Sequence, residues 1–90
     1  MLDGARIAVV IPAKNEERHI AGVLECLPVW VDDVIVVDDG STDRTGDIAR
    51  ASGRCSRLVV HAHSKGVGAA IAAGYRVALG RDADVVAVMA

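Results

Sequence analysis

Four short stretches of the chain are rich in apolar, mostly β-branched residues. They are residues 6–11, 34–37, 58–60 and 84–89. Within each stretch the apolar residues follow one another instead of alternating with polar ones, which is typical of strands buried on both faces of a parallel sheet. We expect Pro12 to end the first strand and the turn residues 38–41 to end the second.

Helical periods fill the three gaps between these stretches. The first predicted helix begins after Asn15, a suitable N-cap, and stops at Pro28. The second begins near 41–42 and ends at Gly53, and the third ends near Gly80. Apolar or small residues share one face at Ile20, Val23, Leu24 and Leu27 in the first helix, and at Val67, Ala70, Ile71, Gly74, Tyr75 and Ala78 in the third.

Strand and helix alternate along the whole chain, so we predict an α/β fold with a parallel sheet and right-handed crossovers. Ligands of such sheets bind beyond the carboxyl ends of the strands. Three polar clusters follow the first three predicted strands, at 12–16, 38–43 and 61–66. Ordinary surface turns would explain any one of them, but three at one sheet edge favour a binding site.

The common nucleotide fingerprints are absent from the expected positions. No glycine follows the first predicted strand, where a dinucleotide-binding G-x-G-x-x-G would begin, and no G-x-x-x-x-G-K-[ST] occurs. Gly66 and Gly68 open a helix, but after the third strand and with Ile71 where a small residue is expected. A nicotinamide cofactor or a P-loop phosphate site is therefore disfavoured.

Asp38 and Asp39 are the more informative pair. A carboxylate only accepts hydrogen bonds, so at a strand end it can read the N–H of a base or the hydroxyls of a ribose. The alternative role is to order the following turn or helix, and two adjacent residues can do both. Lys65, beside the backbone amides at the start of the third helix, could face a phosphate or be a solvated surface lysine.

Composition and charge exclude several classes of function. The chain has 90 residues, 52% of them hydrophobic, but its only aromatic residues are Trp30 and Tyr75 and its net charge is −2. Without a basic tract or an aromatic platform, nucleic-acid binding is not expected. No apolar run approaches the roughly 20 residues that span a bilayer, so we expect a cytoplasmic protein. Cys26 and Cys55 are expected to be buried thiols.

Three blocks of the sequence resemble family 2 glycosyltransferases, with closest similarity to the polyprenyl-phosphate (dolichol-phosphate mannose synthase-like) branch. The blocks are 9–16, 36–45 and 65–75, and the resemblance extends from Arg6 to Ala90. It implies a Rossmann-like GT-A sheet with strand order 3-2-1-4, flanked by helices. It also implies a nucleotide-diphosphate sugar as donor, with UDP and GDP both open, and an acceptor that could be a polyprenyl phosphate at the cytoplasmic face of the membrane.

The resemblance also assigns roles to individual residues. Pro12, Ala13 and Glu16 would line the base and ribose pocket, and Asp39 would bind the base with Asp38 supporting it. Lys65 and Gly66 would lie near the ribose or the diphosphate. Family members often carry Tyr at the position of Ala13 or Lys14, and this chain does not.

The metal site of the family is expected outside this sequence. Its D-x-D motif follows the fourth strand, so the ligands of Mg²⁺ or Mn²⁺ would lie beyond Ala90, as would the catalytic base. Asp82 and Asp84 match D-x-D literally but precede that strand, so we interpret them as a turn. His61 and His63 lack an evident third ligand and are interpreted as a surface pair.

Residues 1–90 are therefore expected to be the amino-terminal, nucleotide-binding part of one glycosyltransferase domain. Its sheet would be incomplete on the C-terminal side, with an apolar edge strand prone to self-association and no turnover by the chain alone. The alternative is a standalone nucleotide-binding or regulatory module. A nucleotidyltransferase is a third possibility, but only Lys14 supplies the basic character that its first loop would need.

Overall fold

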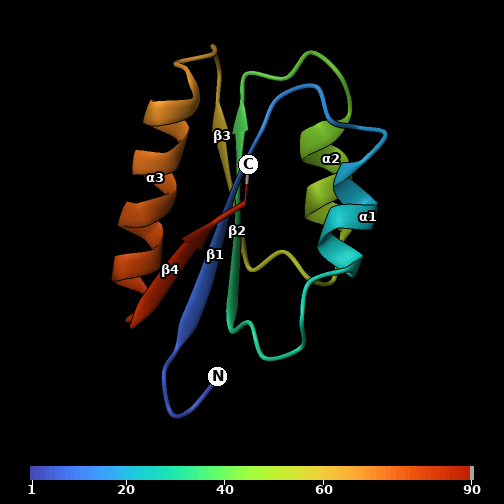
Figure 1. Ribbon diagram of the computed structural model, residues 1–90. Coiled ribbons are helices and arrows are strands. Elements are labelled where there is room, and N and C mark those ends of the chain that lie inside the picture. Colours follow the sequence, from blue (N-terminus) through green and yellow to red (C-terminus); the bar gives the residue numbers. More distant parts are fainter. Residues whose placement is uncertain (90) are drawn as a thin grey trace.

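The computed structural model describes residues 1–89 and shows a parallel sheet between two layers of helices (Figure 1). The strands are β1 (Ile7–Ala13), β2 (Asp33–Asp39), β3 (Arg57–His61) and β4 (Val85–Val88). The helices are α1 (Ile20–Glu25), α2 (Thr45–Ala51) and α3 (Val67–Gly80). All pairings are parallel and the order is β3-β2-β1-β4, which confirms the predicted fold class and strand order.

The sheet separates two apolar cores. Helix α3 covers one face, and α1 and α2 cover the other (Figure 1). Alternate residues of β1 therefore enter different cores: Val10 packs on the α3 side, whereas Val9 and Ile11 pack on the side of α1 and α2. The central strands β1 and β2 are buried almost throughout, as their continuous apolar sequences predicted.

The prediction of burial on both faces is wrong for the outer strands. Val60 of β3 is 54% exposed, and Val85 and Val88 of β4 are 49% and 38% exposed. Both strands are edges of the described sheet, with a neighbour on one side only. An apolar sequence therefore indicated strands here, but it did not distinguish a central strand from an edge.

Pro12 does not end the first strand, because β1 continues through Ala13. The oxygen of Val10 accepts a hydrogen bond from the Met89 amide, so the even-numbered residues of β1 direct their backbone groups toward β4. Strand β4 ends at Val88, opposite Val10 and short of Pro12. The missing N–H of proline therefore removes no hydrogen bond from the sheet.

The first two helices are shorter than predicted. Asn15 is not the N-cap of α1: its φ is 54°, in the left-handed region, and the helix begins five residues later at Ile20. Helix α2 begins at Thr45 instead of near 41–42. The residues predicted to start these helices instead form two loops that bind each other, as described below.

Helix α3 has the predicted bounds, but its buried face is narrower than predicted. Ala70, Gly74 and Ala78 are buried, whereas Val67 is 62% exposed and Tyr75 is 39% exposed. The buried residues are the smallest ones, because the helix lies close to the sheet. No helix within residues 1–89 has the length and apolar character needed to cross a membrane.

The prediction of two buried thiols is wrong for Cys26, which is exposed at the C-cap of α1. Cys55 is half-buried, and burial raises the pKa of its thiol. Both cysteines are free.

Asp33 anchors the amino edge of the sheet, opposite the predicted binding edge. Its carboxylate is 1% exposed and accepts hydrogen bonds from Arg6 Nε at 3.0 Å, Arg6 Nη2 at 3.1 Å and Arg81 Nε at 2.8 Å. Burial is the largest influence and raises the pKa of Asp33, but the hydrogen bonds from Arg81 and Arg6 together outweigh it and lower the pKa. The anchor joins the starts of β1 and β2 to the end of α3.

We expect Asp33→Ala to lower the free energy of unfolding by about 2–3 kcal/mol at pH 7, because it removes hydrogen bonds between charged groups. A lowered folded-state pKa stabilises the fold above the unfolded value of about 3.9, and this contribution is lost as pH falls through the folded pKa. Urea denaturation at pH 7 and pH 3 should therefore show the variant's deficit shrinking in acid. Asp47→Ala, at a carboxylate that is 70% exposed, should change little at either pH.

Candidate functional site

The carboxyl ends of β1, β2 and β3 bring most of the predicted site residues together. The parallel register sets Ala13 beside Asp38, and Asp39 beside His61. A cavity of about 230 Å³, here called the Asp39 cavity, opens at this edge on the α3 side of the sheet. Four predicted residues line it, Pro12, Ala13, Asp39 and Gly66, together with Lys14, Ser64, Val67 and Ala70.

Asp39 is only 5% exposed and its carboxylate holds the β3–α3 loop (62–66) in place. Its Oδ1 accepts hydrogen bonds from His61 Nδ1 and the Lys65 amide, both at 2.8 Å. Its Oδ2 accepts from Ser64 Oγ at 2.9 Å and from the Gly66 amide at 3.0 Å. These four donors match the roughly four lone-pair positions of a carboxylate.

The same donors keep the carboxylate ionised. The Lys65 amide, followed by His61, holds the pKa of Asp39 well below its ordinary value, against the opposing effect of burial. Asp39 therefore presents a fixed negative charge at the wall of the cavity.

Gly40 lets the β3–α3 loop reach Asp39. Its φ is +72°, a left-handed conformation that favours glycine. A Cβ at this position would lie 2.5 Å from the backbone nitrogen of Ser64 and 2.9 Å from the carbonyl carbon of His63. The turn after β2 and the loop after β3 are thus in direct backbone contact, which only a glycine permits.

Asp38 supports the turn from the other face of the sheet. Its Oδ1 accepts a hydrogen bond from the Ser41 amide at 3.1 Å, and a Cβ on Gly46 would lie 2.6 Å from its Oδ2. Asp38 is 6% exposed and does not line the Asp39 cavity. Both aspartates therefore order neighbouring loops, Asp38 the turn that follows β2 and Asp39 the β3–α3 loop, and of the two only Asp39 lines the cavity.

The loops 14–17 and 41–45 are joined by reciprocal hydrogen bonds. Asn15 Oδ1 accepts from the Thr42 amide at 2.9 Å, while the Asn15 amide donates to Ser41 Oγ at 2.9 Å. The Glu16 amide donates to Oγ1 of Thr45, which is fully buried. Sequence reasoning missed this joining role, for which the signal was the recurrence of Asn, Ser, Thr and Asp in two turns at one sheet edge.

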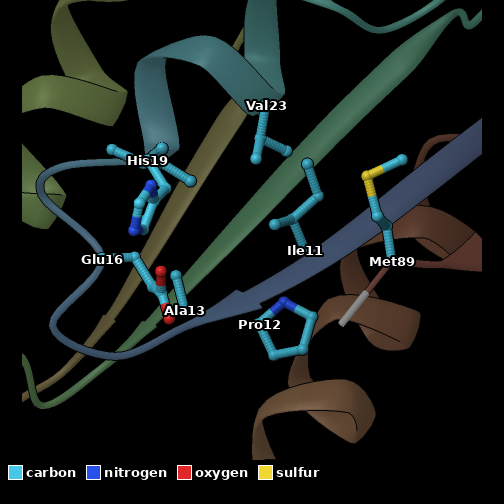
Figure 2. Close-up of a pocket in the computed structure, with 8 residues that line it drawn as sticks. Ile11, Pro12, Ala13, Glu16, His19, Val23 and Met89 are labelled. Carbon is cyan, nitrogen blue, oxygen red and sulfur yellow. The ribbon is translucent and has the colours of Figure 1, made fainter.

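Glu16 lies in a different cavity from Asp39. This second cavity, here called the α1 cavity, has about 220 Å³ and shares the walls Pro12 and Ala13, but it opens on the α1 side (Figure 2). Figure 2 shows Glu16 and His19 beside each other at one end and Met89 at the other. Its lining also includes Ile11, Ile20 and Val23. Sequence reasoning assigned no role to His19.

Lys65, His61 and His63 differ in their exposure and in their contacts with Asp39. The backbone of Lys65 is held by Asp39, while the residue itself is exposed and lines neither the Asp39 cavity nor the α1 cavity. His61 is bound to Asp39 with a side chain 11% exposed, whereas His63 is exposed. The prediction of a surface pair is therefore wrong for His61, whose side chain is largely buried and bonded to Asp39.

Within residues 1–89, no three His, Cys, Asp or Glu side chains gather closely enough to hold a metal ion. Asp82 and Asp84 precede β4 at the amino edge of the sheet, and Asp84 Oδ2 accepts a hydrogen bond from the Arg6 amide at 2.7 Å. Asp82 and Asp84 therefore lie at the sheet edge opposite the Asp39 cavity, as the interpretation of this D-x-D as a turn requires. The D-x-D expected beyond Ala90 lies outside the described residues.

Comparisons with known proteins agree with the observed fold. The model of the family described as glycosyl transferase family 2 matches residues 8–89. An uncharacterised protein of Methanocaldococcus jannaschii is 40% identical over a 76-residue alignment that covers 81% of this chain. The 4,4′-diaponeurosporenoate glycosyltransferase of Staphylococcus aureus is 44% identical over a 52-residue alignment that covers 52% of this chain and 13% of that protein.

Solved structures of glucosyl-3-phosphoglycerate synthase from Mycobacterium tuberculosis are also similar. One, in complex with Mn²⁺, UDP and glucosyl-3-phosphoglycerate, has a TM-score of 0.73 and 34% identity and covers 96% of this chain. Another holds Mn²⁺, UDP-glucose and phosphoglyceric acid, with a TM-score of 0.72. This chain spans 33% of the first of these structures and 30% of the archaeal relative.

Proposed function

This chain belongs to glycosyl transferase family 2, and on that premise we propose that its Asp39 cavity binds the nucleotide of a UDP-sugar donor. The observation that carries the proposal is the buried, ionised Asp39 carboxylate on the wall of a cavity at the carboxyl edge of the sheet. A carboxylate there is an acceptor for the imide N–H of uracil. The relatives that hold UDP support uracil over guanine.

The remaining predicted residues have supporting roles in this proposal. Pro12 and Ala13 form the wall shared by the Asp39 and α1 cavities, against which the base would pack. Gly66 is the N-cap of α3, so the free amides of the helix start point outward near the cavity, where a ribose or diphosphate would lie. Lys65 is exposed and adjoins Gly66, so its side chain would approach the diphosphate as a positive charge. Glu16 lines the α1 cavity and not the Asp39 cavity, so it would contact the nucleotide only where the ligand extends past Pro12 and Ala13 toward α1.

The catalytic step is proposed for the whole protein and not for these residues. The solved relatives hold Mn²⁺ or Mg²⁺ together with UDP. The family resemblance implies that the ligands of such a metal follow β4, so we propose that residues outside 1–89 hold it. What this chain supplies is the binding and orientation of the nucleotide.

For the acceptor we propose a molecule that carries a phosphate group. Two sources share this chemistry. The motif blocks resemble the polyprenyl-phosphate branch, which implies a lipid phosphate at the membrane face, and the mycobacterial relative was solved with phosphoglyceric acid. Purified complete gene product should transfer labelled sugar from UDP-glucose to one of them, undecaprenyl phosphate in micelles or 3-phosphoglyceric acid in solution. Transfer to neither, with UDP bound, would contradict a phosphate-bearing acceptor.

The nucleotide site itself is tested with Gly40→Ala. The added Cβ, 2.5 Å from Ser64 N, must displace the β3–α3 loop from Asp39, so we expect UDP affinity to fall about tenfold or more. Calorimetric titration of the 90-residue chain measures this. Gly53→Ala is the matched control, because a Cβ there meets no atom within 4 Å and its backbone is not left-handed. Equal UDP affinity in wild type and Gly40→Ala would contradict the proposed site.

A further inference from the structure

The Asp39 carboxylate is saturated before any ligand arrives. His61 Nδ1 and the Lys65 amide occupy Oδ1, and Ser64 Oγ and the Gly66 amide occupy Oδ2. A nucleobase N–H that binds Asp39 must therefore replace one of these donors, because a carboxylate has only about four lone-pair positions.

The oxygen of Asp39 for which a nucleobase would compete is Oδ2. The two donors to this oxygen, Ser64 and Gly66, line the Asp39 cavity, whereas the two donors to Oδ1, His61 and Lys65, do not. Oδ2 is thus the carboxylate oxygen whose two donors both line the cavity, and we expect a base inside the cavity to approach this oxygen.

The two donors to Oδ2 differ in how easily they can leave. The Gly66 amide belongs to the backbone at the N-cap of α3, and moving it would move the start of the helix. The Ser64 hydroxyl is turned away by a single side-chain rotation. Ser64 is an exposed residue, so its hydroxyl can bond to water after leaving.

From this geometry we propose that the Ser64 hydroxyl occupies the base position on Asp39 Oδ2 in the free chain and must yield when a nucleobase binds. This inference rests on the proposed binding of a nucleotide at Asp39. Ser64 then holds the β3–α3 loop closed in the absence of ligand and lowers the apparent affinity for nucleotide, because only the conformer with the hydroxyl turned away is competent to bind.

The test is to remove the competitor. Ser64→Ala frees one position on Oδ2, so we expect UDP to bind the 90-residue chain about 2- to 10-fold more tightly than it binds wild type. Ser64→Thr keeps the hydroxyl and should bind as wild type does. A Ser64 that merely stabilised the loop would produce the opposite result, weaker binding in the alanine variant. Titrations followed by NMR can measure these differences even at low affinity.

A second arm separates this inference from the proposed function. In an Asp39→Ala background there is no carboxylate to compete for, so adding Ser64→Ala should leave UDP affinity unchanged. One result would overturn the competition and leave the proposed site intact. In that result, Asp39→Ala lowers the affinity for UDP, but Ser64→Ala leaves the affinity unchanged or lowers it. If Asp39→Ala has no effect on UDP affinity, the proposed site fails and the competition fails with it.

Discussion

Replacing Asp39 with alanine is expected to weaken binding of UDP to this chain by about 10- to 150-fold. The loss of a hydrogen bond to a charged group is worth about 1.5–3 kcal/mol, which corresponds to that range. The substitution also releases all four donors that Asp39 holds, so the β3–α3 loop would no longer be preorganised. Calorimetric titration at pH 7 measures the affinity, and a thermal melt shows whether the variant remains folded.

The control for Asp39→Ala is Asp47→Ala, which removes an exposed carboxylate on α2 and should leave UDP affinity unchanged. Asp39→Asn removes the charge but keeps one acceptor oxygen, and we expect an intermediate loss. If Asp39→Ala binds UDP as wild type does, Asp39 is not in the nucleotide site.

The second large effect is expected at Gly74, in the middle of α3. A Cβ there would lie 2.2 Å from Cγ1 of Val10 and 3.1 Å from its Cγ2. Val10 is fully buried and its Cβ would itself lie 3.2 Å from the added atom, so rotating its side chain does not clear the contact and we expect Gly74→Ala to push α3 away from β1. Overpacking of this kind costs about 1–3 kcal/mol, and we expect the upper part of that range. Folded domains of this size are stable by only about 5–15 kcal/mol, so the loss is large.

Gly80→Ala is the matched control, because it lies at the end of the same helix and a Cβ there meets no atom within 4 Å. It should be neutral or slightly stabilising, as alanine favours a helix over glycine. Urea denaturation of both variants gives the comparison. In addition, Val10→Ala should recover part of the loss in the Gly74→Ala background, so that the double variant is more stable than the two single effects predict. Additive losses would contradict the proposed steric contact.

The strands and their order were predictable because their signals are local. Continuous apolar runs identified all four strands, and the family resemblance implied the observed order. The sequence around Pro12 does not show that the strand continues through this proline. That outcome depends on β4, more than 70 residues later in the chain, which ends opposite Val10. A proline by itself favours the end of a strand, but Pro12 lies at a position of β1 where the sheet requires no hydrogen bond.

The starts of α1 and α2 were misjudged for a related reason. Asn15 is a good N-cap by composition, but its side chain instead accepts hydrogen bonds from Thr42, 27 residues away. The local sequence of the loop 14–17 does not show that it will bind the loop 41–45, and the reverse is also true. Bonds across that separation depend on the parallel pairing of β1 with β2, which brings the carboxyl ends of the two strands together.

The candidate site was predicted in part. The position of Asp39 at a strand end indicated an acceptor, and its cavity does collect Pro12, Ala13 and Gly66. The four hydrogen bonds that saturate Asp39 come from residues 22 to 27 positions away, on a loop whose path depends on Gly40. The separation of Glu16 from Asp39 follows from the chain turning toward α1 after Ala13, which the spacing of residues alone does not reveal.

The most direct test of the central claim is a crystal structure of this chain with UDP. We expect the uracil ring in the Asp39 cavity, between Pro12–Lys14 and the β3–α3 loop, with its imide N–H within hydrogen-bonding distance of Asp39 Oδ2. The Ser64 hydroxyl should have turned away from that oxygen. A uracil ring in the α1 cavity beside Glu16 and His19, or in the groove between α1 and α2, would contradict the assignment of this cavity as the nucleotide site.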